Sequence, residues 1–333
     1  MTRYSRRIQK IGSSMIISLP VEWVKGNKIE KGDIIDLEIN QDNSVSVLPP
    51  TEIIENISEV TIQVTESDKE SLVNHIYGAY LLGFNIIKIK GRESISFDTR
   101  ENIKNVTRNL MGLEIIDENS GGLTLQFLLD MGTLNAEKIL RRMSSIIIGM
   151  QKDAFSILKN HEKNVQRIIL SRDDEVDRQY FLLVRLIRSA MMEQKLLKKL
   201  NLTNIDILDY RIAANYLESM GDHIVDFADS ISSCKNILLI ELNDLESIIE
   251  DMHVKAISGF INRNRSDSIE VIKSYKVLDG LLNQIKEEYM RQENNPTDVT
   301  VKILNAIFSV DKAAKCLKDI ADLVKPVVNV QKK

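Results

Sequence analysis

The sequence has little of several residue types that mark particular classes of protein. It contains two cysteines, Cys234 and Cys316, which are too few for a disulfide framework and are not spaced as metal ligands. Both fall in helical patterns, so we expect buried free thiols in a reducing compartment. Five prolines and 5% aromatic residues favour long helices over a β-sandwich.

Long apolar runs and an excess of basic charge are also absent. No stretch of 18 or more apolar residues predicts a membrane helix, and Met1 is not followed by the apolar core of a signal peptide. The formal net charge is −4, so a site for nucleic acid must be a local basic patch. We therefore expect a cytoplasmic protein with no membrane insertion.

The length and the changes of pattern predict a multidomain chain. The 333 residues exceed what one small core usually holds, and 43% hydrophobic with 28% charged residues is ordinary for a globular protein. The predicted domains are residues 1–50, 51–132, 133–236 and 237–333.

The first domain combines a basic segment with short alternating strands. Its first eighteen residues carry four basic side chains and no acid. The basic segment before Met15 is the first predicted strand, and further strands are predicted at residues 15–19, 35–39 and 45–47 with a helical turn at residues 21–25. The predicted order is therefore strand, strand, helix, strand, strand. About fifty residues are too few to bury a core alone, so we expect a homodimer that shares one barrel.

The order of short motifs in this domain is specific. A Gly-x-Ser loop at Gly12, a Leu-Pro pair ending at Pro20 and a Lys-Gly-Asp turn at Gly32 resemble the SpoVT/AbrB/MazE-type DNA-binding domain over roughly residues 3–49. The resemblance implies a dimeric swapped-hairpin β-barrel (AbrB-like). It also implies that DNA is contacted by Arg6, Arg7, Lys10, Gly12, Ser13 and Ser14.

Elementary electrostatics agrees with this assignment. Clustered guanidinium and ammonium groups bind phosphates and release counterions, and arginine can also form paired hydrogen bonds with guanine. The alternatives are a solvated basic face, or a barrel that serves mainly to dimerise or to bind a partner.

Residues 51–132 predict a small α+β domain without recognisable chemistry. The predicted order is βαβαββ, with strands at 59–64, 85–90, 113–116 and 123–128 and helices at 68–82 and 99–111. His75 lies on an apolar helix face, where a core position is more frequent than a ligand. The domain either senses a ligand or spaces the two ends of the chain.

Residues 133–333 predict an all-α region of tandem three-helix bundles. The predicted helices are 136–159, 165–200, 205–235, 241–261, 266–291 and 297–324. The two units read as repeats, because Leu217–Asp229 can be laid over Val310–Asp322.

An acidic stripe follows one helix of the first repeat. Glu218, Asp222 and Asp226 recur at i, i+4 positions on one face, and Asp173 and Asp177 share that spacing on a neighbouring helix. Like charges at this spacing repel one another, so we expect a shared cation.

The stripe is broken in the second repeat. Lys315 replaces Asp222, and Tyr275 replaces Asp173. We expect the Lys315 ammonium to substitute for the cation there.

The acidic motifs resemble the PhoU family of phosphate-uptake regulators over roughly residues 135–325. That family carries a (Glu/Asp)-xxx-Asp signature on adjacent helices of tandem three-helix bundles. The resemblance implies metal clusters on the acidic faces, phosphate-responsive control and frequent dimers. An AbrB-like domain ahead of PhoU-like bundles is an arrangement associated with archaeal regulators.

The predicted metal ligands are Asp173, Asp177, Glu218 and Asp222, with Asp226 a weaker candidate. Their carboxylate oxygens suit a hard or borderline divalent or trivalent metal ion, with Mg, Mn, Fe and Zn all open. The alternative is a solvated helix face neutralised by Arg172 and Arg178.

Three functions are compatible with these patterns. The first is a DNA-binding transcriptional regulator of phosphate uptake with a metal-binding helical sensor. The second is an interaction protein that regulates a phosphate transporter or sensor kinase without binding DNA. The third, a di-iron carboxylate enzyme, needs two Glu-x-x-His motifs, whereas this chain has one, from Glu250 to His253. We therefore expect no enzyme.

Overall fold

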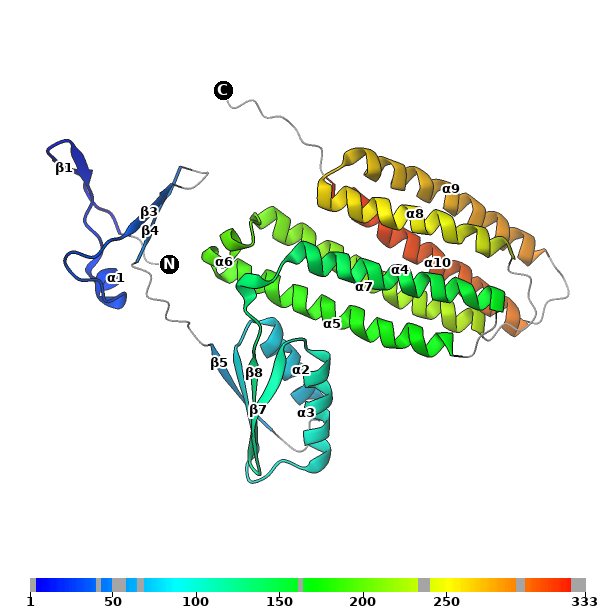
Figure 1. Ribbon diagram of the computed structural model, residues 1–333, viewed down its shortest axis with the longest axis horizontal. Helices are drawn as coiled ribbons and strands as arrows, with labels where there is room; N and C mark the ends of the chain where they lie inside the picture. Colours follow the sequence, from blue (N-terminus) through cyan, green and yellow to red (C-terminus); the bar gives the residue numbers. More distant parts are fainter. Residues whose placement is uncertain are drawn as a thin grey trace. The chain divides into compact units, whose positions relative to one another are not determined.

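The computed structural model describes residues 4–39, 43–49, 58–64, 69–160, 164–232, 240–291 and 297–324. The chain divides into two compact units, Met1–Asn56 and Ile57–Lys333 (Figure 1). Cys234 lies outside the described residues, so its expected burial stays a prediction.

The N-terminal unit consists of two separate hairpins and a short helix. Strands β1 (Gln9–Ile11) and β2 (Ser14–Ile16) pair antiparallel, as do β3 (Asp36–Ile39) and β4 (Val45–Leu48). Helix α1 (Val21–Gly26) lies between them in the chain, which is the predicted order. Gly12 turns the first hairpin with a φ of 62°, a conformation that glycine adopts without steric cost.

The apolar side chains of this unit lie in solvent. No described side chain between Tyr4 and Pro49 is buried. Met15 is 71% exposed, Leu37 68% and Ile39 80%. Exposed apolar side chains in this number on two short hairpins favour an interaction site. A single copy of these two hairpins therefore has no core of its own.

The second unit begins with a four-stranded sheet that has two helices on one face (Figure 1). The elements are β5 (Glu59–Gln63), α2 (Lys69–Leu81), β6 (Ile86–Lys90), α3 (Phe97–Asn109), β7 (Leu113–Asn119) and β8 (Gly122–Phe127). The strand order is β5-β6-β8-β7, with β5 parallel to β6 and the other pairs antiparallel. Alternate side chains such as Ile87, Ile89 and Leu125 form the buried face.

The predicted βαβαββ order is present, but β7 is longer than expected. The prediction ended this strand at Ile116 and placed a long loop after it. In the structure Asp117, Glu118 and Asn119 continue to pair with β8, after an irregularity between Ile115 and Asp117. These polar residues belong to an edge strand, where charge protects against unwanted strand pairing.

The rest of the second unit is helical. After a short 3-10 turn at Met131–Thr133 come α4 (Ala136–Asn160), α5 (Val165–Met192), α6 (Gln194–Lys199), α7 (Asn204–Ser232), α8 (Ile240–Asn262), α9 (Arg265–Met290) and α10 (Thr297–Asp322). In the described part of the chain no helix has the length and apolar character needed to cross a membrane.

The predicted helix at residues 165–200 is wrong as a single element. The backbone at Glu193 is extended, with φ −124° and ψ 104°, and this separates α5 from α6. Neither glycine nor proline marks the break. The change of direction allows Leu196 and Leu197 to be buried, so tertiary packing overrides a continuous helical pattern.

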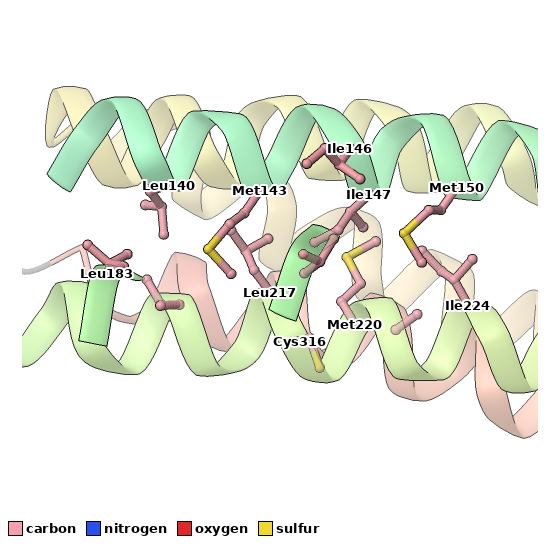
Figure 2. Packing of buried hydrophobic residues seen from close by; sticks show 14 of the residues in the cluster. Leu140, Met143, Ile146, Ile147, Met150, Leu183, Leu217, Met220, Ile224 and Cys316 are labelled. Carbon is pink, nitrogen blue, oxygen red and sulfur yellow. The ribbon is translucent and has the colours of Figure 1, made fainter. Parts of the chain in front are cut away.

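The helices pack in two groups that share a long contact. Helices α4, α5 and α7 lie against one another, α8, α9 and α10 do the same, and α7 lies along α10. Figure 2 shows Met143 and Ile147 of α4 meeting Leu217 and Met220 of α7, with Cys316 of α10 close by. Burial raises the pKa of the Cys316 thiol to about 12.

Candidate functional site

Four of the five predicted metal ligands lie together between α5 and α7. The charge of Asp222 on α7 acts on both Asp173 and Asp177 of α5, and Glu218 acts on Asp173. The two helices approach closely at Gly221, where an added Cβ would stand 3.0 Å from Asp173 Oδ1. The absence of a side chain at Gly221 therefore leaves room for the Asp173 carboxylate.

The carboxylates at this position destabilise one another's ionised forms. Burial, followed by repulsion from Asp222, raises the pKa of Asp173 from 3.8 to about 7. The same two causes raise the pKa of Asp177 to about 6. Burial also raises the pKa values of Glu218 and Asp222. A cation held among these oxygens would remove the repulsion.

The arginines expected to neutralise the stripe contact other acids. Arg172 pairs with Asp153 of α4, and Arg178 pairs with Glu175 at 3.1 Å. Among the described residues, Asp173, Asp177 and Asp222 have no basic partner within ion-pair distance. The alternative of an arginine-neutralised face is therefore wrong for Arg172 and Arg178.

The stripe has the donor atoms of a metal site but not its geometry. Within the described residues, no group of three or more His, Cys, Asp or Glu side chains is placed to hold a metal ion. The donor set fits a hard cation in its chemistry, and the carboxylates would have to turn towards one another to bind it. Asp226 stands apart, since its side chain is 70% exposed and lies 4.0 Å from His223 Nδ1.

The second repeat replaces this arrangement with internal hydrogen bonds. Tyr275 Oη donates to Asp311 Oδ1 at 3.0 Å, and these residues occupy the positions of Asp173 and Glu218. The Lys318 ammonium donates to Asp319 at 3.3 Å and to Asp322 at 3.0 Å. Lys315, which we expected to supply the ammonium, is exposed. The expectation for Lys315 is therefore wrong. The ammonium that pairs with the acids of the second repeat is that of Lys318, which lies one residue from Asp319 and one helical turn from Asp322.

The predicted DNA-contacting residues lie in and around the first hairpin. Lys10 is in β1, Gly12 and Ser13 form the turn, and Ser14 begins β2. Arg6 and Arg7 precede β1, and all six residues are exposed. The Arg6 guanidinium lies over the ring of Tyr4, 5.6 Å from its centroid. Among the described residues, none of the three basic side chains has a carboxylate partner, so their charge is available to an external anion.

A buried arginine that the sequence reasoning missed joins the sheet domain to α5. Arg185 is fully buried and donates to the carbonyl oxygens of Tyr80 at 2.6 Å and Gly83 at 3.3 Å, and to Asn85 Oδ1 at 3.2 Å. Its guanidinium lies 3.9 Å from the ring centroid of Phe127. Burial lowers the pKa of Arg185 to about 10. A single arginine within the apolar segment 181–187 was the available signal.

The Glu-x-x-His motif does not form a shared site. Glu250 pairs with Lys152 on the surface at 2.7 Å. His253 is fully buried, its Nε2 lies 3.0 Å from Ser144 Oγ, and burial lowers its pKa to about 3. The two side chains of the motif thus have different environments, and His253 forms part of the contact between α4 and α8.

Comparison with known proteins agrees with a repeated helical region that follows a separate N-terminal unit. The PhoU domain model matches residues 140–231 and 242–330, which is more than half of the chain. This protein therefore belongs to the PhoU family. Residues 8–54 match the model described as antidote-toxin recognition MazE, bacterial antitoxin. No curated protein matches the chain.

Two solved structures share the helical fold. The phosphate transport system regulatory protein PhoU from Streptococcus pneumoniae is 14% identical, with a TM-score of 0.50, over 57% of this chain and 91% of that one. PhoU from Pseudomonas aeruginosa is 16% identical, with a TM-score of 0.51, over 57% of this chain and 93% of that one. At these identities the likeness concerns the fold alone.

Proposed function

We propose that this protein is a DNA-binding regulator of phosphate uptake whose helical half holds a metal ion. The observation that carries the proposal is the combination, in one chain, of PhoU domains with an N-terminal unit whose basic hairpin has no acidic partner among the described residues. The PhoU domains support a role in phosphate-uptake regulation. The exposed guanidinium and ammonium groups support contact with DNA phosphates.

The exposed apolar surface supports a homodimer. Side chains such as Met15, Leu37 and Ile39 need a partner surface to leave water. A second copy of the same unit supplies the same side chains, so one shared swapped-hairpin β-barrel would bury both sets. That dimer would place two copies of Arg6 and Arg7 on one DNA-binding surface.

The metal ion would bind between α5 and α7 in the first repeat. Asp173, Asp177, Glu218 and Asp222 would hold it, with Asp226 at the rim. The ion would supply positive charge among carboxylates whose raised pKa values reflect burial and mutual repulsion. We also propose the division into domains at residues 1–50, 51–132, 133–236 and 237–333, with the last two as three-helix bundles.

DNA binding by the full chain tests the proposal. The wild-type protein should bind DNA from upstream of phosphate-transport genes at low salt, and Arg6→Ala/Arg7→Ala should weaken binding. Because the dimer carries two copies of each arginine, up to four phosphate contacts are lost, and the magnitude of the log–log salt slope should fall by about 4. Lys25→Ala/Lys31→Ala, which removes two exposed charges outside the basic hairpin, is the matched control.

The second candidate is a regulator that acts on a phosphate transporter or sensor kinase without DNA. The PhoU domains favour it as well, since they form most of the chain. Absence of DNA binding at low salt, together with partner binding that survives Arg6→Ala/Arg7→Ala, would replace the first proposal with this one.

A further inference from the structure

The last residues of α5 present apolar side chains to solvent at one end of the helical region, beside α6 (Figure 1). Met191 is 67% exposed and Met192 86%. The end of α2 lies close to this point, because a Cβ added at Gly83 would stand 3.0 Å from Ser189 Oγ, and the preceding Leu82 is 64% exposed. Exposed apolar side chains from two elements therefore lie near one another, which favours an interaction site.

The lysines of α6 lie beside these methionines and face solvent. The extended backbone at Glu193 ends α5, and α6 then buries its two leucines against the core. Lys195, Lys198 and Lys199 recur at i, i+3 and i+4 positions on the opposite side of α6, and all three are exposed. Among the described residues, neither Lys195 nor Lys199 has a carboxylate within ion-pair distance. Their charge is therefore available to an external anion.

The composition of this segment indicates the kind of partner. Residues 191–200 contain three lysines and one acid, with no arginine and no aromatic residue. Protein–protein interfaces are enriched in aromatic residues, methionine and arginine but depleted of lysine, so the lysines argue against a protein partner. Lysine ammonium groups beside flexible apolar side chains instead match a lipid surface, where phosphates lie above the acyl chains.

We propose that this methionine–lysine patch binds the surface of a membrane that contains anionic lipids. The patch consists of Met191, Met192, Lys195, Lys198 and Lys199. The methionine side chains reach the boundary between headgroups and acyl chains, and the ammonium groups bind lipid phosphates. The leucines of α6 stay in the protein core, so the contact is made by surface side chains and inserts no helix. It is independent of the proposed DNA and metal binding, because it uses other residues.

Sedimentation of the full-length protein with lipid vesicles tests the proposal. Arg6→Ala/Arg7→Ala serves as the reference protein, so that the basic hairpin contributes little to binding. At low salt it should bind vesicles of phosphatidylcholine with about one third phosphatidylglycerol at least about tenfold more tightly than vesicles of phosphatidylcholine alone. Adding Lys195→Glu/Lys199→Glu should weaken binding to the anionic vesicles at least about 30-fold, whereas Lys195→Arg/Lys199→Arg should preserve it.

Two further variants of the reference protein separate the apolar contribution from general charge effects. Met191→Ser/Met192→Ser should weaken binding to the anionic vesicles at least about tenfold, because it removes the apolar side chains that leave water. Lys276→Glu/Lys286→Glu makes the same change of charge at two exposed lysines of α9 and should have little effect.

Hydrogen exchange with and without the anionic vesicles locates the contact. Amides at residues 191–200 should exchange more slowly when vesicles are present, and those of α9 should not change. The proposal is overturned if the reference protein stays in solution with the anionic vesicles, or if Lys195→Glu/Lys199→Glu weakens binding no more than the α9 control does.

Light scattering of the methionine variant distinguishes a lipid surface from a second copy of the chain. Met191→Ser/Met192→Ser should leave the mass of the protein in solution unchanged while it weakens vesicle binding. A lower mass together with unchanged vesicle binding would show that the patch joins two copies of the chain, and it would overturn the proposal.

Discussion

The contact between the sheet domain and α5 depends on the buried guanidinium of Arg185. Arg185→Leu removes three hydrogen bonds from a charged donor and a cation–π contact, each worth about 1–3 kcal/mol in gross terms. Part of this is offset, because a buried charge without a carboxylate partner is itself costly. In the variant, the Tyr80 carbonyl oxygen would still accept a hydrogen bond from the Gly83 N–H, which lies 3.1 Å away. We expect a net loss of about 2–4 kcal/mol.

Lysine at the same position provides a discriminating comparison. Arg185→Lys keeps the charge but replaces the planar fork with a compact ammonium that cannot reach the same three acceptors. It should therefore destabilise the domain contact at least as much as leucine does. Arg188→Leu, on the exposed side of the same helix, is the control and should change stability by less than about 0.5 kcal/mol.

Hydrogen exchange measured element by element is the suitable assay, because a chain with two compact units does not unfold in one transition. For Arg185→Leu, protection of amides in α2, β6 and β8 should fall by about 30-fold to 1,000-fold, as 1.4 kcal/mol corresponds to a factor of ten. Amides of α9 and α10 should change little. Unchanged protection in β6 and β8, or an equal loss throughout the helices, would refute the assignment of Arg185 as the link.

Three further predictions concern the acidic stripe and the N-terminal unit. Folding raises the pKa of Asp173 from 3.8 to about 7, so in metal-free protein the ionisation of Asp173 lowers the stability of the fold as pH rises between these values. Asp173→Asn should therefore raise Tm at pH 8 and have little effect at pH 4. A rise in Tm seen only at low pH would contradict this reasoning. Elemental analysis should find less bound metal in Asp177→Asn/Asp222→Asn than in the wild type. The control Asp174→Asn, which changes an exposed acid, should bind as much metal as the wild type. Equal metal content in all three proteins would exclude the site. Leu37→Lys places a charge on the exposed apolar face and should convert a dimer into a monomer in light scattering, and an unchanged mass would count against the shared barrel.

The sequence predicted the helical half well because its apolar spacing is regular over long segments. A window of twenty or more residues with one apolar face leaves few alternatives to a helix. The break at Glu193 escaped prediction since no glycine or proline marks it and the burial of Leu196 and Leu197 depends on distant contacts. Likewise, the extra pairs of β7 depend on its partner strand and not on its own composition.

The candidate site was predictable in part for a similar reason. Spacing of four residues places Glu218 and Asp222 on one face of a helix whatever the fold. That this face meets Asp173 and Asp177 depends on the packing of α5 on α7, which the sequence does not specify directly. The partners of Arg172 and Arg178 were also out of reach, because each arginine can extend towards several neighbouring acids. The metal ion itself stays a prediction.

The hydrogen bond between Tyr275 and Asp311 has a consequence for how the two helical repeats respond to their surroundings. The hydrogen bond from the Tyr275 phenol to the Asp311 carboxylate links α9 to α10 without a bound ion. If the proposed metal ion binds the first repeat, the second repeat would therefore not depend on it, because its corresponding residues are already joined by this hydrogen bond. Since α7 packs along α10, a rearrangement that the proposed metal ion caused in the first repeat would act against a second repeat that does not rearrange with it.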